Sequence, residues 1–371
     1  MLQTLKTMRG AVAAPHHLAS QAGLRVLQDG GNAIEAMVAA ASTVAVVYPH
    51  MNAIGGDNFW LLALPRSDVR GIDACGRAAA KADIAFYRDR GLETIPSRGP
   101  LAALTVSGAV SGWQRALEVG AEWGGSMPLE RLLEDAEYHA RAGFPVTKSQ
   151  HVKTTEKLPE LADVSGFAEC FLADGRPPEV GSTFKNPAFA ETLRRLGRDG
   201  LDDFYRGTLA QSIAADLEEV GSPVNAEDLA GHQAIFVAPL EMILASGSIY
   251  NMPPPTQGLA SLILLGVYEQ LGIEVAEGFD FVHGLVEATK CAFRVRDAHV
   301  TDPTYMDVTP ADFLTPDALK GMASSVDGTK AAPWPEAGPG GDTVWLGAID
   351  GQGRTVSFIQ SIYWEFGSGV V

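Results

Sequence analysis

The chain has 371 residues, of which 46% are hydrophobic and 20% are charged, and its formal net charge is -17 at pH 7. This composition provides for a sizeable apolar core and argues against global disorder, because disordered chains combine low hydrophobicity with high net charge. So acidic a chain lacks the excess of lysine and arginine that nucleic acids and anionic membranes attract, and we expect neither as a partner.

The cysteines and the N-terminus bear on the compartment. Cys75, Cys170 and Cys291 are too few and too scattered for a disulfide framework or a zinc knuckle. The first ten residues are too polar for a secretory signal. The most apolar stretch, 33–48, is interrupted by polar residues and is too short to span a bilayer. We therefore expect a soluble, cytoplasmic protein.

The first elements in chain order are two helices and two strands. Apolar residues near helical spacing predict a helix over 18–27, which ends at Asp29-Gly30-Gly31-Asn32. A run over 33–47 that is apolar on nearly all sides predicts a second helix, buried in the core. Strands over 59–64 and 69–74 follow and form a hairpin.

The middle of the chain is predicted to be mainly helical, with Gly, Pro and Asp between the helices. Helical periodicity covers 112–119, 129–142, 187–196 and 203–220. A strand over 240–250 then leads into a proline-rich turn at 251–258. Two more helices follow, over 259–271 and 283–299.

The last part of the chain changes character abruptly. Residues 324–342 are rich in Pro, Gly and Ala and poor in β-branched residues, which predicts an exposed, poorly ordered linker. Strands over 344–349 and 354–361 follow directly, joined by a tight turn. We therefore divide the chain into a region of 1–342 that ends in the linker and a region of 343–371.

Thr343 is the first residue after this linker, behind Gly340-Gly341-Asp342. If the chain is cut between Asp342 and Thr343, the new α-amine, with a pKa of about 8, can activate the threonine hydroxyl as its base. The same hydroxyl can make the cut by attacking the Asp342 carbonyl, and the glycines make that peptide deformable. The alternative is an ordinary threonine at a boundary between linker and strand.

Other catalytic patterns are weaker. The sequence has no Gly-x-Ser-x-Gly elbow, no Gly-x-x-x-x-Gly-Lys loop and no His-Glu-x-x-His, so we expect neither a cofactor nor a metal. His16-His17 fits a helix cap better than a metal pair, because adjacent side chains diverge on a helix. His50, close to Gly55-Gly56-Asp57, either lines a site or packs near a turn. No basic cluster surrounds Cys75 in sequence to activate its thiol.

Several segments resemble γ-glutamyltransferases in their order and spacing, over essentially the whole chain. Two of these segments are specific to that family: the Met-Pro-Pro-Pro turn, and the threonine together with the Phe-Gly-Ser-Gly block that follows it. The segments are Gly31-Asn32-Ala33, Gly55-Gly56, Asp203-Phe204-Tyr205-Arg206-Gly207-Thr208, Tyr250-Asn251-Met252-Pro253-Pro254-Pro255, Thr343 with Asp350-x-x-Gly353, and Phe366-Gly367-Ser368-Gly369.

The resemblance implies an α+β fold, the αββα sandwich of the N-terminal-nucleophile hydrolases, incomplete here because the chain ends early in the small subunit. It implies a zymogen that cleaves itself before Thr343 into a heterodimer of large and small subunits. Thr343 would then take an acyl group from an amide and pass it to water or an amine. Ser361 falls where relatives carry a hydroxyl that supports the nucleophile.

Three positions depart from the γ-glutamyl pattern. Cys75 falls where relatives hold the substrate α-carboxylate with an arginine, which leaves Arg77, two places later, as the candidate. Tyr363 replaces an asparagine near the other end of the substrate and adds bulk, and Trp364 and Glu365 replace smaller polar residues. Arg77, Tyr363 and Glu365 are therefore the predicted substrate-binding residues. These changes look like a γ-glutamyltransferase-like subgroup that includes an amidohydrolase acting on oxamate.

Three functions stay open. The first is transfer or hydrolysis of a γ-glutamyl group from a glutathione-like donor. The second, motivated by Cys75 and Tyr363, is hydrolysis of a smaller carboxylate amide such as oxamate. The third is an inactive, unprocessed proenzyme fragment with a binding role, because the chain stops at Val371 and the oxyanion-hole residues of the family lie beyond that point.

Overall fold

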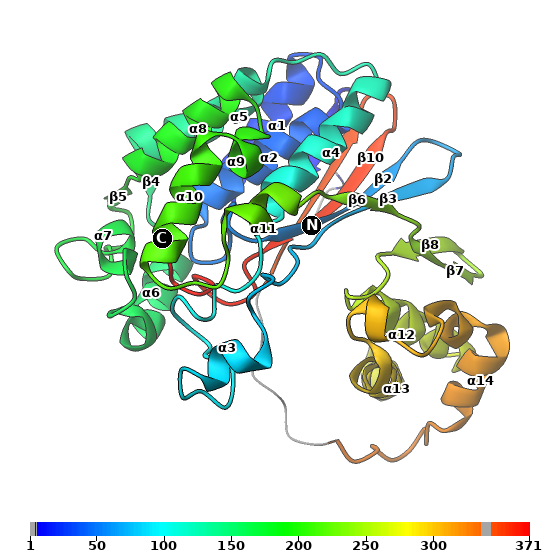
Figure 1. The fold of residues 1–371 in the computed structure, drawn as a ribbon. Coiled ribbons are helices and arrows are strands. Elements are labelled where there is room, and N and C mark those ends of the chain that lie inside the picture. The colour runs from blue at the N-terminus through cyan, green and yellow to red at the C-terminus, as the bar shows by residue number, and fades with distance from the viewer. Residues whose placement is uncertain (1–3, 5, 335–342) are drawn as a thin grey trace. The chain divides into compact units, whose positions relative to one another are not determined.

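The computed structural model describes residue 4 and residues 6–334 and 343–371, which divide into two compact units (Figure 1). The first unit comprises Met1–Ser67, Ile72–Ile235 and Gly341–Val371, and the second comprises Asp68–Gly71 and Phe236–Gly340. Among the described residues, no helix is both long and apolar enough to cross a membrane.

A six-stranded sheet organises the first unit, in the order β1-β9-β10-β2-β3-β6. The last two strands of the chain lie inside this sheet, because β9 pairs antiparallel with β1 and β10 pairs antiparallel with β2. The strand bounds are Gly10–Ala13 for β1, Asp57–Ala63 for β2, Val69–Ala74 for β3, Ile235–Val237 for β6, Val344–Asp350 for β9 and Thr355–Ser361 for β10. The predicted strands in these regions are confirmed.

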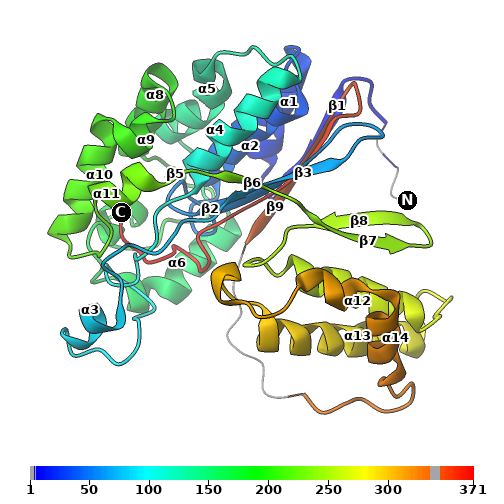
Figure 2. The ribbon, with the colours of Figure 1, turned by 45° about the vertical axis from the view of Figure 1, so that its right-hand side comes forward.

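Helices cover one face of the sheet, as Figure 2 shows. Helix α2 packs on β9 and β10, α4 packs on β2, and α5 and α8 form a further layer behind α2. All fifteen residues of α2 are buried, as its apolar sequence predicts, and Asn32 with Glu35 forms a capping box at its start. The bounds are His17–Gln28 for α1, Ala33–Val47 for α2, Ala109–Glu122 for α4, Leu129–Ala142 for α5 and Pro187–Asp199 for α8.

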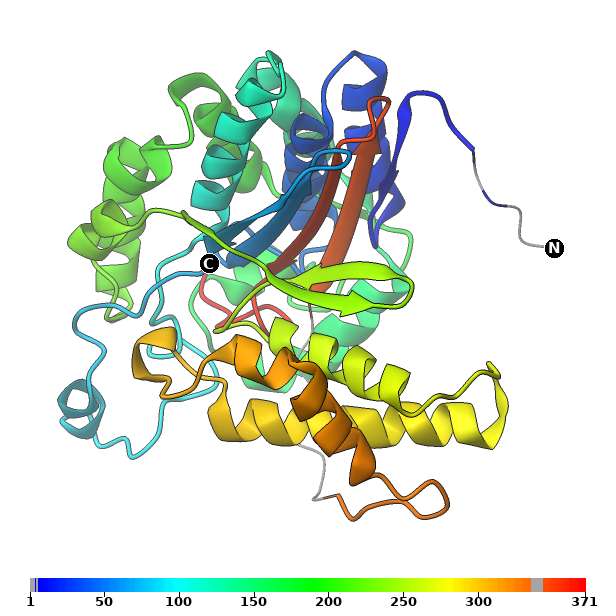
Figure 3. The same cartoon turned by 90° about the vertical axis from the view of Figure 1, so that its right-hand side faces the viewer.

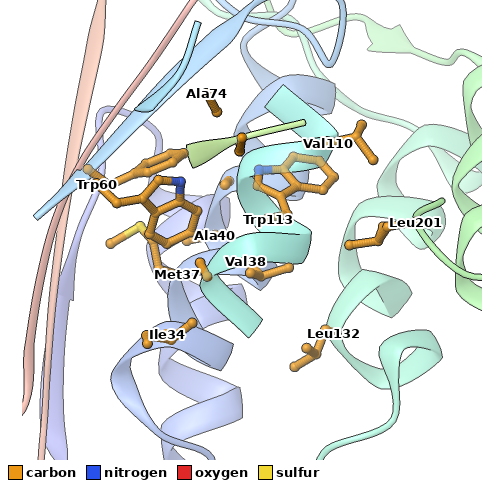
Figure 4. Close-up of a cluster of buried hydrophobic side chains, with 14 of the residues drawn as sticks. Ile34, Met37, Val38, Ala40, Trp60, Ala74, Val110, Trp113, Leu132 and Leu201 are labelled. Carbon is orange, nitrogen blue, oxygen red and sulfur yellow. The ribbon is translucent and has the colours of Figure 1, made fainter. Parts of the chain in front are cut away.

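The main core lies between the sheet and these helices. Figure 4 shows Met37 of α2, Trp60 of β2 and Trp113 of α4 pointing into the same apolar space. Both tryptophans are fully buried, and Trp60 stacks at a tilt on Phe358 of β10 with 4.3 Å between ring centroids. Aromatic side chains of this size dominate the burial energy of a core, so they fix the sheet against α2 and α4.

Polar side chains within this core are joined through Gln360 of β10. Its Oε1 accepts from Trp113 Nε1 at 3.0 Å and from Asn58 Nδ2 at 3.3 Å, and its Nε2 donates to Asn52 Oδ1. All four residues are fully buried. Such a network is stable only while each member keeps its partners.

Replacing Gln360 with leucine is expected to lower the free energy of unfolding by about 3 kcal/mol, because it removes the partner of the buried Trp113 Nε1 and Asn52 Oδ1 atoms. Asn58 Nδ2 loses the weaker of its two bonds and keeps the one to the Ala109 carbonyl. Urea denaturation measures the change. Ser357→Ala, in the same strand, is the control. Its effect should stay within about 0.5 kcal/mol, because the bond it loses comes from Nε1 of the exposed Trp345, which can bond to water instead. Equal losses in the two variants would contradict the network's importance.

The remaining elements of the first unit are short apart from α6 and α10. A predicted helix over 203–220 is divided at Gly207, because the Asp203 carboxylate accepts from the Leu209 amide and so interrupts the helical pattern. The bounds are Ile84–Arg88 for α3, Lys148–Leu161 for α6, Phe167–Phe171 for α7, Asp203–Arg206 for α9, Thr208–Glu219 for α10, Ala226–Gly231 for α11, Phe144–Pro145 for β4 and Thr183–Phe184 for β5.

The second unit is a small helical body with one hairpin (Figure 3). The single strand predicted over 240–250 is in fact two strands joined by a turn at Ala245-Ser246, after which β8 begins at Gly247, a glycine with a φ of 138°. Apolar residues of the hairpin, α12, α13 and α14 form its own core. The bounds are Leu240–Leu244 for β7, Gly247–Asn251 for β8, Gly258–Gln270 for α12, Gly278–His299 for α13 and Pro316–Ser324 for α14.

The predicted linker of 324–342 is described only in its first part. Helix α14 ends at Ser324, and 325–334 form no further helix or strand. Residues 335–342 lie outside the described residues, so the linker prediction is not tested there.

Candidate active site

The two predicted catalytic residues meet at one end of the hairpin formed by β9 and β10. Gln360 pairs with Val344 in this hairpin, so the next position brings Thr343 opposite Ser361. The two hydroxyl oxygens, Thr343 Oγ1 and Ser361 Oγ, are 3.0 Å apart. Thr343 is exposed, whereas Ser361 is half-buried and accepts from the Tyr363 amide at 2.9 Å. Asp342, the other side of the predicted cleavage site, lies outside the described residues.

Gly56 explains how the end of β10 comes so close to β2. A Cβ at this position would lie 1.9 Å from the carbonyl oxygen of Ser361, a distance no real side chain tolerates. The neighbouring Gly55 has open space, with its nearest atom, Ser107 Oγ, 3.9 Å away. Of the glycine pair noted in the sequence, Gly56 is therefore the one that the site needs.

The segment after Ser361 carries two predicted substrate-binding residues, which differ in their surroundings. Tyr363 is 69% exposed and has a φ of 72°, a strained backbone conformation for a residue other than glycine. The Glu365 carboxylate instead pairs with Lys153 at 3.1 Å and Lys157 at 3.8 Å, both on α6. Burial alone would raise the pKa of Glu365, but a backbone hydrogen bond and these lysines outweigh it and hold the pKa below its usual value.

Arg98 holds the same segment and is not evident from the sequence. Its Nη1 donates to the carbonyl oxygens of Glu365, at 2.8 Å, and Gly367, and its guanidinium pairs with Glu160 of α6 at 3.0 Å. Arg98 stands in an irregular stretch with no motif around it, so only the folded chain shows that it anchors a segment more than 260 residues away.

His50 packs beneath this segment. Of its two predicted roles, lining a site or packing near a turn, the structure shows the packing role. It is fully buried, its carbonyl accepts from the Phe366 amide at 2.9 Å, and its Nε2 lies 3.2 Å from Ser149 Oγ. Burial lowers the pKa of His50 to about 3, so the ring is neutral near pH 7. His16 caps α1 by accepting from the Leu18 amide, as predicted.

The third predicted substrate-binding residue, Arg77, lies in an acidic corner next to β2. Arg77 is exposed, and its carbonyl accepts from the Val106 amide at 3.0 Å. Before it, the Cys75 amide donates to Asp73 Oδ1 and the Gly76 amide donates to Asp57 Oδ1, both at 2.8 Å. Burial, with the charges of Asp57 and Asp73, raises the pKa of the Cys75 thiol, which argues against a reactive cysteine.

The structure thus brings Thr343 and Ser361 into contact, places Tyr363 beside them, and engages Glu365 with α6. Within the residues that the structure describes, no group of three or more His, Cys, Asp or Glu side chains is placed to hold a metal ion. What the site presents instead is a pair of hydroxyls at the start of a strand, an arrangement suited to nucleophilic attack once a base is supplied.

Comparison with known proteins identifies the wider family. Residues 19–371 match the family model described as gamma-glutamyltranspeptidase. The chain is 50% identical over 363 residues to the oxamate amidohydrolase proenzyme of Klebsiella pneumoniae subsp. pneumoniae, and the alignment covers 98% of this chain and 68% of that protein. It is 37% identical to the glutathione hydrolase-like YwrD proenzyme of Bacillus subtilis, over 97% of this chain and 68% of that protein.

Solved structures agree with this assignment. The crystal structure of cephalosporin acylase from Bacillus halodurans matches with a TM-score of 0.88 and 31% identity, and the match covers 100% of this chain and 69% of that one. The predicted fold class is therefore confirmed, and the described residues supply one large sheet of it with the helical layer on one face. The chain belongs to the gamma-glutamyltranspeptidase family of N-terminal-nucleophile hydrolases.

Proposed function

We propose that the protein cleaves itself before Thr343 and then transfers acyl groups from amides through an ester on Thr343. The observation that carries this proposal is the 3.0 Å contact between Thr343 Oγ1 and Ser361 Oγ at the first position before β9. Ser361 Oγ also accepts from the Tyr363 amide, which holds the Ser361 hydroxyl in place beside Thr343. That contact orients the Thr343 hydroxyl for attack.

The reaction proceeds in two halves. The free α-amine of Thr343 takes the hydroxyl proton while Oγ1 attacks the amide carbonyl, and the collapsing intermediate expels the amine, which receives that proton. Water or a second amine then attacks the ester, and Thr343 is regenerated. In this scheme 1–342 form the large subunit and 343–371 begin the small one.

The proposed acyl donor is an amide that also carries a carboxylate. The family assignment and the YwrD relative favour a γ-glutamyl donor of the glutathione type. A smaller amide such as oxamate is the second candidate, because Cys75 stands in an acidic corner and the bulky Tyr363 adjoins Ser361. The 50% identical oxamate amidohydrolase proenzyme supports the same candidate.

A small amide panel separates the candidates. Full-length protein is incubated with glutathione, γ-glutamyl-p-nitroanilide and oxamate, and the release of cysteinylglycine, p-nitroaniline or ammonia is followed. Turnover of the two γ-glutamyl amides with none of oxamate supports the first candidate, and the reverse result supports the second. No turnover of any amide by protein that has cleaved itself would rule out the proposed function.

Arg77→Ala tests how the carboxylate is held. If Arg77 contacts it, KM should rise by roughly 30- to 150-fold, the equivalent of about 2–3 kcal/mol for a charge-assisted contact, with kcat little changed. Arg77→Lys should recover only part of the loss, because lysine cannot make a bidentate contact. Unchanged kinetics in Arg77→Ala would remove this residue from the site.

A further inference from the structure

Three adjacent strands place side chains in one row at the nucleophile's end of the sheet. Thr343 precedes β9, Ser361 ends β10, and Asp57 begins β2, directly opposite Ser361 in the antiparallel register. Residues directly opposite each other in such a pair project on the same face, with Cβ atoms about 4.5–5.5 Å apart. The Asp57 carboxyl therefore lies two strands, or roughly 10 Å, from the nucleophile.

Two hydrogen-bond donors from one loop converge on this carboxyl. The Gly76 amide donates to Oδ1 at 2.8 Å and the Cys75 thiol lies 3.7 Å from Oδ2, whereas the Gly108 amide donates to the Gly56 carbonyl at 2.9 Å. The same loop packs closely on Val106, because a Cβ at Gly76 would lie 1.5 Å from the Val106 carbonyl oxygen. Asp57 thus ties the loop at 75–76 to β2, at the position beside Ser361.

Arg77 follows directly in the tied segment. Its backbone is held on one side by the bond from the Gly76 amide to Asp57, and on the other by the bond from the Val106 amide to the Arg77 carbonyl. Because the backbone is fixed at these two points, the position of the Arg77 Cα atom, from which the exposed side chain extends, is fixed as well. The other charged or titratable groups around Asp57 are Asp73, Cys75 and Tyr205.

The ionised carboxyl costs stability in this position. Burial, only partly offset by the Gly76 amide and the Cys75 thiol, raises the pKa of Asp57 to about 6 from 3.8. A folded pKa above the unfolded one means that the folded state gains stability as the pH falls through 6 towards 4. A neutral side chain would therefore suit the fold better at neutral pH, which points to a role for the carboxylate in the site.

We propose that Asp57 is a positioning residue whose carboxylate holds the segment 75–77 so that Arg77 meets the substrate's carboxylate beside Thr343. The proposal rests on the proposed function of the site. A protonated carboxyl or an amide offers fewer acceptor positions to the same donors. Asp57→Asn at any pH should therefore behave like the wild-type protein at low pH.

The test compares full-length wild-type protein with Asp57→Asn between pH 5 and 8, using the amide from the panel that the wild type hydrolyses. KM of Asp57→Asn should be about tenfold above wild type at pH 8 and nearly independent of pH, with kcat within about twofold. The wild-type KM should rise towards the same value as the pH falls below about 6. At pH 8 the variant should melt at the same temperature or higher.

A second measurement does not depend on activity. Arg77 is exposed, so trypsin can cut after it, and a loosened segment should be cut several-fold faster in Asp57→Asn than in the wild type, as peptide mass spectrometry would show. Asp203→Asn is the matched control, because that carboxylate also accepts a backbone amide, from Leu209, and pairs with Arg195. It should lose stability without a change in KM or in cleavage after Arg77.

Three results would overturn the proposal. They are an unchanged KM with unchanged tryptic cleavage, a KM that falls because a repulsive charge has been removed, and a lower melting temperature with kcat and KM impaired together. If processed wild type hydrolyses no amide of the panel, the proposed function fails, and the tryptic cleavage rate alone then decides whether Asp57 holds the segment.

Discussion

Thr343→Ala is expected to abolish both self-cleavage and amide turnover. Without the Oγ1 atom that lies 3.0 Å from Ser361 Oγ, no nucleophile is available to attack either the Asp342 carbonyl or a substrate. Loss of a nucleophile typically costs at least about 10⁴-fold in kcat. Mass spectrometry after incubation should show one polypeptide for the variant and two, divided between Asp342 and Thr343, for the wild type.

Thr343→Ser is the control for this experiment, because serine keeps both the hydroxyl and, after cleavage, the α-amine. It should still cleave itself and turn over substrate, more slowly if the threonine methyl helps to fix the hydroxyl rotamer. A wild-type chain that stays intact would instead support the third possibility, an unprocessed proenzyme fragment. Turnover by Thr343→Ala would disprove the role of this residue.

Gly56→Ala is expected to have the second largest effect. Its Cβ would lie 1.9 Å from the Ser361 carbonyl oxygen, 2.7 Å from the Ser361 carbonyl carbon and 2.9 Å from Ile362, so β10 must move away from β2. Overpacking of this kind costs about 1–3 kcal/mol of stability. A displacement of about 1 Å at the reacting groups costs roughly 100-fold in rate. Chemical denaturation and the rate of self-cleavage measure the two effects.

Gly55→Ala provides a matched control one residue away. Its Cβ meets only Ser107 Oγ, at the ordinary contact distance of 3.9 Å, so this variant should fold and cleave itself like the wild type. If the two alanine variants behaved alike, the close approach of Gly56 to Ser361 would not be what positions the hydroxyl pair.

The resemblance to γ-glutamyltransferases predicted the hydroxyl pair, and the structure shows that its two members meet because they belong to one local hairpin. Strand signals on both sides of the Asp350–Gly353 turn set the antiparallel pairing, and that pairing brings Thr343 opposite Ser361. The helices α1, α2 and α5 were predictable for a similar reason, since each has a continuous apolar pattern with clear ends.

Tertiary contacts account for what the sequence did not indicate. Arg98 donates to the Glu365 carbonyl, and Asp57 accepts from the Gly76 amide. The sequence around Arg98 and Asp57 contains no motif that predicts these partners. Two predicted elements, the helix over 203–220 and the strand over 240–250, were each divided in the structure. Both divisions have a local cause that helix and strand propensities do not indicate. The Asp203 side chain ended a helix early, and the turn at Ala245-Ser246 divided what had the composition of a single strand.

In the proposed mechanism, the place of β9 and β10 in the sheet makes self-cleavage depend on completed folding. These strands span Val344–Asp350 and Thr355–Ser361, yet they insert between β1 and β2, which lie within the first 63 residues. Thr343 cannot meet Ser361 beside Gly56 until that long-range closure has occurred, which is the slow part of forming such a topology. After the cut, the ladders to β1 and β2 hold the new N-terminus in place. If the proposed cleavage occurs, a cleaved chain is therefore one that has folded, and a chain that fails to fold does not gain the α-amine that serves as the catalytic base.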